Sequence, residues 1–196
     1  MVKTKIAVLV SGGGTNLQAL LDAQAAGKIP HGEIVLVVSN KEGAYALTRA
    51  EKAGVATAVI TGKDFETRLS SVLETAGIQM IILAGFMKIL SGNFTSRWPE
   101  RILNIHPALI PSFCGEGYYG LRVHEEALRY GVKVTGATVH FVNEIPDGGR
   151  IIAQKAVEIQ EGDTPEILQR RVMEQAEWIL LPQATEIVAE KLSTHF

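Results

Sequence analysis

The first half of the chain alternates strand-like and helix-like segments, and no other feature of the sequence constrains the fold so strongly. Each helix-like segment is followed by a glycine, Gly27, Gly54 or Gly77, where a helix commonly ends. The alternation predicts strands at 5–10, 33–39, 55–60 and 80–83, with helices at 16–26, 44–53 and 65–76 between them. Strands and helices that alternate with short connections are typical of a parallel sheet covered by helices on both faces. We therefore expect an α/β fold.

The pattern changes after residue 100. Strands are expected at 101–106, 133–142 and 150–158, separated by loops. A long helix near 164–192 follows the capping sequence Asp163-Thr-Pro-Glu166. The chain shows no repeats, low-complexity tracts or linker, so a single domain over 1–196 is expected.

Composition excludes several classes of protein. The net charge of −2 over 196 residues argues against a nucleic-acid or membrane-surface binder. No apolar run approaches the length of a membrane span, and the first apolar segment is too short for a signal peptide. Cys114 is the single cysteine, so neither an internal disulfide nor a structural zinc site is expected. These features predict a soluble, cytoplasmic protein without a metal.

Asn104-Ile-His-Pro107 closes the apolar run that begins at residue 101. Side chains alternate along a strand, so Asn104 and His106 share a face while Ile105 points the other way. An amide donor beside an imidazole suits chemistry in which an oxyanion forms while a proton moves. The alternative is a hydrogen-bonded core histidine beside a turn asparagine, and the motif alone does not decide between them.

The loop 11–16, Ser-Gly-Gly-Gly-Thr-Asn, lies between a predicted strand and a predicted helix. Glycines allow backbone N–H groups to approach an anion at a helix N-terminus, which indicates phosphate binding. The loop lacks the lysine of a Walker motif, and Leu17 stands where a dinucleotide fingerprint has its third glycine. The alternative is a tight turn in which Thr15 or Asn16 caps the helix.

Two further segments are open to a functional or a structural interpretation. Asp147, in Pro146-Asp-Gly-Gly, is placed to orient an imidazole and raise its pKa, but the same residues also form a plain β-turn. The apolar run 84–90 suits a slot for a flat heteroaromatic ligand, or the protein core. His124 and His140 are expected to support such a site or to be structural. The segment 107–123 is expected to be an irregular, functional loop.

Taken together, these motifs resemble the folate-dependent formyltransferases, and within them the phosphoribosylglycinamide formyltransferases. The matching motifs stand in order at 11–18, 84–90, 104–107, 136–142 and 147–149, and the resemblance runs from about residue 4 to 192. It implies a Rossmann-like, seven-stranded, mostly parallel sheet with helices on both faces. It also implies formyl transfer from 10-formyltetrahydrofolate to the amine of 5'-phosphoribosylglycinamide in de novo purine biosynthesis.

The resemblance assigns roles to individual positions. It makes His106, Asn104 and Asp147 the catalytic set. The ribonucleotide would contact Gly14, Thr15, Asn16 and Glu177. The folate would contact Asn104, the loop 143–147 and the set Arg68, Met87, Lys88, Ile89 and Leu90. It makes a cis bond plausible at Ile110-Pro111. Residues 115–120 are expected to be extra relative to many members, which also have a lysine where Cys114 stands, so no role is carried over for the loop 112–123.

Alternative functions come from different classes. A formyltetrahydrofolate deformylase would use water in place of the amine, although that enzyme usually carries an additional N-terminal domain for which this chain has no room. A methionyl-tRNA formyltransferase normally has a nucleic-acid-binding domain and more basic charge. A non-catalytic nucleotide-binding module would explain the glycine loop alone. The expected partners are the two small substrates, in a monomer or a homodimer.

Overall fold

The computed structural model describes residues 2–194, so residues 1, 195 and 196 of the predicted domain lie outside the described part. A single seven-stranded sheet has the order β3-β2-β1-β4-β5-β6-β7. Strand β6 runs antiparallel to both of its neighbours, and the remaining pairs are parallel. The strands are β1 (Thr4–Val10), β2 (Gly32–Ser39), β3 (Ala56–Val59), β4 (Met80–Leu83), β5 (Ile102–His106), β6 (Val134–Phe141) and β7 (Ile151–Glu158). The predicted mostly parallel, seven-stranded sheet is confirmed.

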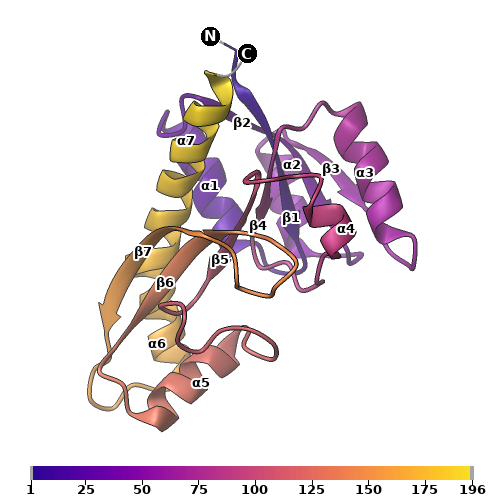
Figure 1. Cartoon of the computed structure of the whole chain (residues 1–196). Helices are drawn as coiled ribbons and strands as arrows, with labels where there is room; N and C mark the ends of the chain where they lie inside the picture. The colour runs from indigo at the N-terminus through magenta and orange to yellow at the C-terminus, as the bar shows by residue number, and fades with distance from the viewer. Residues whose placement is uncertain (1, 195–196) are drawn as a thin grey trace.

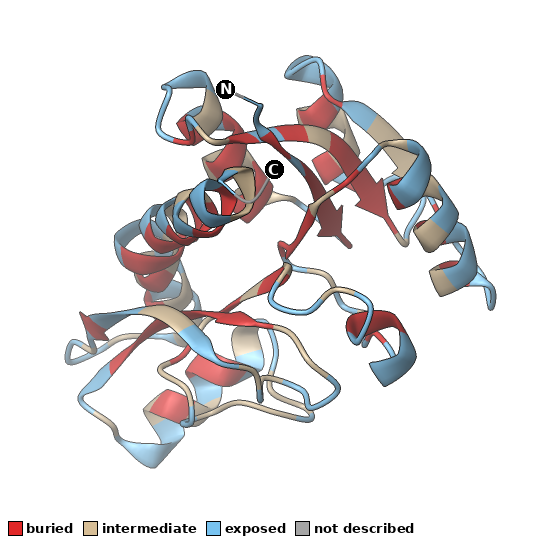
Figure 2. Ribbon diagram, turned by 45° about the horizontal axis from the view of Figure 1, so that its top comes forward, coloured by how far each residue is buried: buried red, intermediate tan, exposed pale blue. Residues whose placement is uncertain are grey.

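Helices cover both faces of this sheet, as predicted (Figure 1). Along β1, Ile6 and Val8 pack into one buried cluster with helices α1 (Thr15–Ala25), α2 (Tyr45–Lys52) and α7 (Trp178–Ser193). Ala7 and Leu9 point the other way, into a second cluster with α3 (Phe65–Thr75) and the short α4 (Gly92–Thr95). Because β1 is covered on both faces, its sequence is nearly all apolar. Figure 2 shows the central strands of the sheet mostly red, that is, buried.

The expectation that only loops separate the last three strands is wrong. Helix α5 (Leu121–Tyr130) lies between β5 and β6, and it buries Val123, His124 and Ala127. The helix begins inside the segment 107–123, which was expected to be irregular throughout. It ends at Gly131, whose φ of 84° suits glycine. The Gly- and aromatic-rich sequence before it masks its start, because such residues usually predict loops.

The final helix is interrupted, whereas one continuous helix was predicted over 164–192. It consists of α6 (Pro165–Val172), a π-helical turn (Met173–Glu177) and α7. Its start follows the predicted capping sequence, since the Thr164 side chain accepts a hydrogen bond from the Ile167 N–H at 3.3 Å. A π turn accommodates one extra residue and so changes which side chains face the sheet.

The carboxyl ends of β1, β4 and β5 meet at one edge of the sheet, because the three strands are parallel neighbours. The loop after β1 contacts the loops that follow β4 and β2. Ser11 Oγ accepts from the Met87 N–H at 2.8 Å and donates to Asn40 Oδ1 at 2.7 Å. The predicted cis peptide at Ile110-Pro111 is present. Within residues 2–194, no helix combines the length and apolar character needed to cross a membrane.

Candidate active site

A cavity of about 910 Å³ opens at this edge of the sheet. In open parallel sheets, ligands bind beyond the carboxyl ends of the strands, so its position fits a substrate site. The walls combine segments that are far apart in the sequence. They include residues 12–16, residues 84–89, the end of β5, residues 115–120, His124, Asp147 and Glu177.

Asn104, His106 and Asp147 meet on one wall of the cavity. The alternation along β5 places Asn104 and His106 on the same face, as predicted. Asp147 Oδ1 lies 3.4 Å from Asn104 Nδ2, and its Oδ2 lies 3.5 Å from His106 Nδ1. The structure therefore brings the three predicted residues together, with an amide donor, an imidazole nitrogen and a carboxylate around one point.

The ring of His106 has a defined orientation. Its Nε2 lies 2.8 Å from the Phe113 carbonyl, which only accepts, so Nε2 carries a hydrogen and Nδ1 faces Asp147. Burial lowers the pKa of His106 below its usual 6.5, while the Asp147 charge and the Phe113 carbonyl act to raise it. The two acceptors thus compensate for part of the cost of charging a buried ring.

Asp147 occupies a tight turn with a φ of 55°. The Gly148 N–H donates to the Ile145 carbonyl at 2.9 Å, so the structural interpretation as a β-turn is also confirmed. A Cβ at Gly149 would lie 1.8 Å from the Phe141 carbonyl oxygen, which explains the glycine. Burial acts to raise the pKa of Asp147, but His140, His106 and the Gly115 N–H together hold it below its usual value. The carboxylate is therefore ionised at neutral pH.

His140 supports this wall from β6. Its Nδ1 lies 2.8 Å from the Phe141 carbonyl and must donate there. Its Nε2, 3.4 Å from Asp147 Oδ1, is an acceptor in the neutral ring and a donor to that carboxylate in the charged ring. Asn104 Nδ2 lies 3.1 Å from that Nε2. This contact orients the Asn104 amide with its donor group toward Asp147.

The glycine loop does not use a side-chain cap, so the alternative in which Thr15 or Asn16 caps the helix is wrong. The N-cap of α1 is Gly14, in a left-handed conformation with a φ of 73° and without a capping side chain. The first N–H groups of α1 therefore remain for another acceptor. Lys41, two residues beyond β2, lines the same cavity. Sequence reasoning missed this cation, although its place after a strand end was a usable signal.

Glu177 reaches the cavity from the π turn and is only 4% exposed. Asn16 Nδ2 donates to Glu177 Oε2 at 2.7 Å. Burial raises the pKa of Glu177 to about 7, and the hydrogen bond from Asn16 offsets part of that rise. The Asn16 Oδ1 is buried without a hydrogen-bond partner among residues 2–194, so it is an acceptor available to a ligand.

Some of the residues that the resemblance assigned to folate line the cavity, and others lie outside it. Met87, Lys88 and Ile89 line the cavity, and Met87 and Ile89 expose 49% and 70% of their surface. Leu90 is buried in the core against α3 and α4, and Arg68 bonds the Thr61 carbonyl at 3.3 Å, outside the cavity lining. The segment 84–90 is thus buried at both ends, at Ala84 and Leu90, and exposes Met87 and Ile89 to the cavity between them.

His124 is a cavity residue that sequence reasoning left undefined. It is fully buried on α5, and neither ring nitrogen has a hydrogen-bond partner within residues 2–194. Burial lowers its pKa to about 4, with a smaller contribution from His106. No local sequence signal distinguishes it, because its surroundings come from distant segments.

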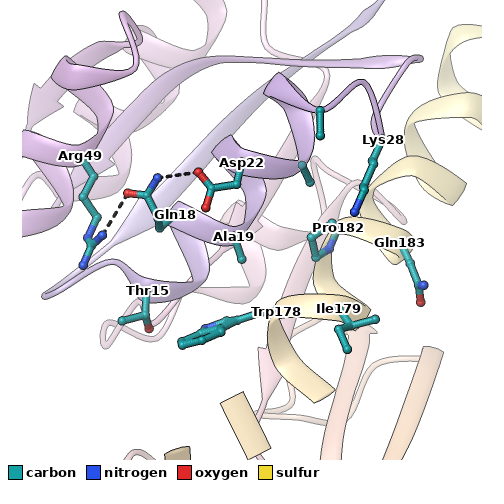
Figure 3. Close-up of a pocket in the computed structure, with 12 residues that line it drawn as sticks. Thr15, Gln18, Ala19, Asp22, Lys28, Arg49, Trp178, Ile179, Pro182 and Gln183 are labelled. Carbon is teal, nitrogen blue, oxygen red and sulfur yellow. Dashed lines mark hydrogen bonds between the residues drawn. The ribbon is translucent and has the colours of Figure 1, made fainter. Parts of the chain in front are cut away.

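A second cavity of about 590 Å³ lies between α1 and α7 (Figure 3). Trp178 and Pro182 form part of it, and Gln18 links Arg49 to Asp22 along its rim. It shares Thr15 with the first cavity but contains none of the predicted catalytic residues. Within residues 2–194, no group of His, Cys, Asp or Glu side chains is arranged to hold a metal ion.

Comparisons with known proteins identify formyltransferases over most of the chain. Residues 4–185 match the formyl transferase family. A phosphoribosylglycinamide formyltransferase of Haemophilus influenzae is 44% identical over 177 residues, which cover 87% of this chain and 81% of that protein. The trifunctional purine biosynthetic protein adenosine-3 of Gallus gallus is 49% identical over 195 residues, 95% of this chain. The chain spans only 18% of that trifunctional relative.

Solved structures show the same similarity. A glycinamide ribonucleotide transformylase 1 from Symbiobacterium toebii matches with a TM-score of 0.89 and 41% identity, over 96% of this chain and 89% of that chain. A formyltetrahydrofolate deformylase from Pseudomonas syringae pv. tomato matches with a TM-score of 0.86 at 23% identity, over 96% of this chain and 62% of that chain. The second likeness concerns the fold alone.

Proposed function

Because the chain belongs to the formyl transferase family, and to the phosphoribosylglycinamide formyltransferases within it, we propose that it transfers a formyl group from 10-formyltetrahydrofolate to the amine of 5'-phosphoribosylglycinamide. The products are formylglycinamide ribonucleotide and tetrahydrofolate, and the step belongs to de novo purine biosynthesis. One observation carries the proposal. A single cavity joins an uncapped helix start, suited to a phosphate, to the cluster of Asn104, His106 and Asp147.

The order of the strands supports a division of the cavity between the substrates. The ribonucleotide phosphate binds at Gly14, Thr15 and Asn16 after β1, with Glu177 contacting the rest of that substrate. The folate occupies the slot after β4, beside Met87, Lys88 and Ile89, and reaches Asn104 and the loop 143–147. Contacts of the folate with Leu90 and Arg68, which do not line the cavity, stay predictions. Strand β5 is the next neighbour of β4, so in the proposed arrangement the formyl group and the amine meet over His106.

The chemistry follows from the donors on the cavity wall. The amine nitrogen attacks the formyl carbon, and the carbonyl oxygen becomes an oxyanion. Asn104 Nδ2 and the protonated Nδ1 of His106 donate hydrogen bonds to that oxygen. Loss of one such donor typically costs about 10²–10³ in turnover. The bond to the folate nitrogen then breaks, and His106 Nδ1 gives its proton to that nitrogen. The proton lost by the amine returns to Nδ1 through water, assisted by Asp147.

The negative charge of Asp147 is what permits a buried imidazolium. It lies 3.5 Å from His106 Nδ1 and acts to raise the pKa of that ring. Binding both substrates in one orientation lowers the barrier further by several kcal/mol. The proposed step uses neither a covalent nucleophile nor a metal. A single domain over 1–196, a cytoplasmic location, a monomer or homodimer, and the absence of nucleic-acid and membrane partners stay predictions.

The test is a formyl-transfer assay with and without 5'-phosphoribosylglycinamide. We expect tetrahydrofolate to form only when the ribonucleotide is present, with one formylglycinamide ribonucleotide for each tetrahydrofolate. Release of tetrahydrofolate and formate without the ribonucleotide would instead identify a deformylase. No turnover under either condition, with the ribonucleotide bound, would leave the non-catalytic nucleotide-binding module.

A further inference from the structure

Two backbone groups of the segment 113–115 contact His106 and Asp147, two of the three proposed catalytic residues. The Phe113 carbonyl lies 2.8 Å from His106 Nε2, and the Gly115 N–H donates to Asp147 Oδ2 at 2.9 Å. His106 therefore lies between two acceptors, the Phe113 carbonyl on Nε2 and the Asp147 carboxylate on Nδ1. A neutral ring has one N–H and satisfies one of them, whereas an imidazolium satisfies both.

The two acceptors favour opposite tautomers of the neutral ring. Asp147 favours a hydrogen on Nδ1, and the Phe113 carbonyl favours a hydrogen on Nε2. The carbonyl lies at hydrogen-bond distance, while Asp147 Oδ2 is 3.5 Å away, so the Nε2–H form is the one present. In that form Nδ1, which faces the cavity and Asp147, is the atom that gains and loses the titrating proton.

The Phe113 carbonyl that contacts His106 belongs to a residue with a left-handed backbone, with a φ of 49°. Within residues 2–194, positive φ values at non-glycine residues occur at Glu100, Phe113 and Asp147, and the last two both contact His106. A bulky residue adopts this conformation only when surrounding contacts impose it. The Phe113 ring packs against Tyr118, with centroids 6.4 Å apart, and against Tyr130 in a T-shaped contact at 6.1 Å.

We propose that the aromatic cluster of Phe113, Tyr118 and Tyr130 is a positioning device that holds His106 in its Nε2–H tautomer and so directs proton transfer through Nδ1. The Tyr118 N–H donates to the Gly115 carbonyl at 3.2 Å, so the same turn carries the ring and the N–H that binds Asp147. Tyr118 belongs to the stretch 115–120 that is expected to be extra in this chain. The proposal rests on the proposed function for its effect on turnover, but not for its effect on the tautomer.

The tautomer is measured by ¹⁵N NMR of histidine-labelled, substrate-free protein at alkaline pH, where protonated and bare ring nitrogens have distinct shifts. A His106→Asn variant identifies the His106 signals. We expect wild type and Tyr118→Phe, which keeps the ring, to have the hydrogen on Nε2. We expect Tyr118→Ala and Phe113→Ala to move it to Nδ1, where Asp147 accepts it, in part or completely. The His140 ring, bonded to the Phe141 carbonyl, serves as an internal reference for a folded site.

Turnover provides the second readout. Tyr118→Ala should lower kcat by at least ~10-fold, because a misplaced catalytic group loses its alignment, and Tyr118→Phe should restore it. A wild-type ring protonated on Nδ1 would overturn the proposal, as would an unchanged Nε2–H tautomer in both alanine variants. If wild type transfers no formyl group, the proposed function fails while the NMR comparison still decides the role of the cluster.

Discussion

Asn16 Nδ2 donates to Glu177 Oε2 at 2.7 Å, which joins the first turn of α1 to the π turn that precedes α7. The two residues are 161 positions apart, and both line the cavity. The hydrogen bond fixes the amide so that Asn16 Oδ1 is left as a buried acceptor without a partner among residues 2–194. The pair therefore contributes a polar wall to the end of the cavity proposed for the ribonucleotide, and the protonation state of Glu177 affects the stability of the fold.

Stability should fall with rising pH because of Glu177. Its pKa is about 7 in the folded protein against an ordinary 4.5, so between these values the folded protein binds a proton that the unfolded chain releases. The free energy of unfolding should therefore decrease from pH 4.5 to 7, by roughly 3 kcal/mol from this group, and level off above. Urea unfolding at pH 5, 6, 7 and 8 measures it. Glu177→Gln should remove this dependence, and Glu174→Gln, at an exposed site, should keep it. Parallel curves for wild type and Glu177→Gln would contradict the prediction.

Removing either oxyanion donor should affect the chemistry rather than the fold. Asn104→Ala and His106→Ala should each lower turnover by at least ~100-fold with the fold intact. His31→Ala is the matched control, because His31 precedes β2 at the opposite edge of the sheet and pairs with Glu186. It should leave turnover unchanged. Near-normal turnover in either site variant would remove that residue from the catalytic set.

Neutralising Asp147 should change the titration of His106. Asp147→Asn keeps the shape of the side chain but removes the charge that acts to raise the His106 pKa. That pKa is already below its usual value, so we expect it to fall further, with a large loss of turnover. NMR titration of the His106 ring measures the change. Glu125→Gln, which removes an exposed carboxylate on α5, is the control. An unchanged His106 titration in Asp147→Asn would leave Asp147 as a turn residue only.

Gly14 should be required for the shape of the glycine loop. Its φ is 73°, and an added Cβ would lie 2.6 Å from the Ala46 Cβ, so Gly14→Ala combines backbone strain with a clash. We expect a loss of at least ~1 kcal/mol in the free energy of unfolding. Gly12→Ala is the comparison, because a Cβ there has no atom within 4 Å, and its stability should match wild type. Equal stabilities of the two variants would show that the loop rearranges freely.

Ribonucleotide binding should weaken more than folate binding in Gly14→Val. The valine would displace the start of α1 from Ala46, and the loop after β1 is separate from the folate slot after β4. The apparent Michaelis constants for the ribonucleotide and for the folate measure this difference. Ligand-free crystals grown with phosphate or sulfate should hold the anion near Gly14, Thr15 and Asn16. Equal weakening of both substrates would contradict the proposed division of the cavity.

Local patterns were enough to predict most of the fold. The strand–helix alternation, the helix-ending glycines and the threonine cap at 164 each act within a few residues, so they are readable before the chain folds. The same holds for the shared face of Asn104 and His106, which follows from strand geometry. The start of α5 and the π turn escaped this reasoning. Both depend on packing against other elements. Packing overrides the loop-like sequence at the start of α5 and the uniformly helical sequence around the π turn.

The sequence by itself therefore determined the sheet, its two covered faces and the identity of the polar groups at the strand ends. Tertiary structure alone decided how those groups meet. It sets the orientation of His106 through the Phe113 carbonyl, that of Asn104 through His140, and the burial that raises the pKa of Glu177. The physical reason is that tautomers, amide orientations and pKa values are set by neighbours within a few ångströms. Those neighbours come from segments far apart in the chain, which only the sheet order and the helix packing bring together.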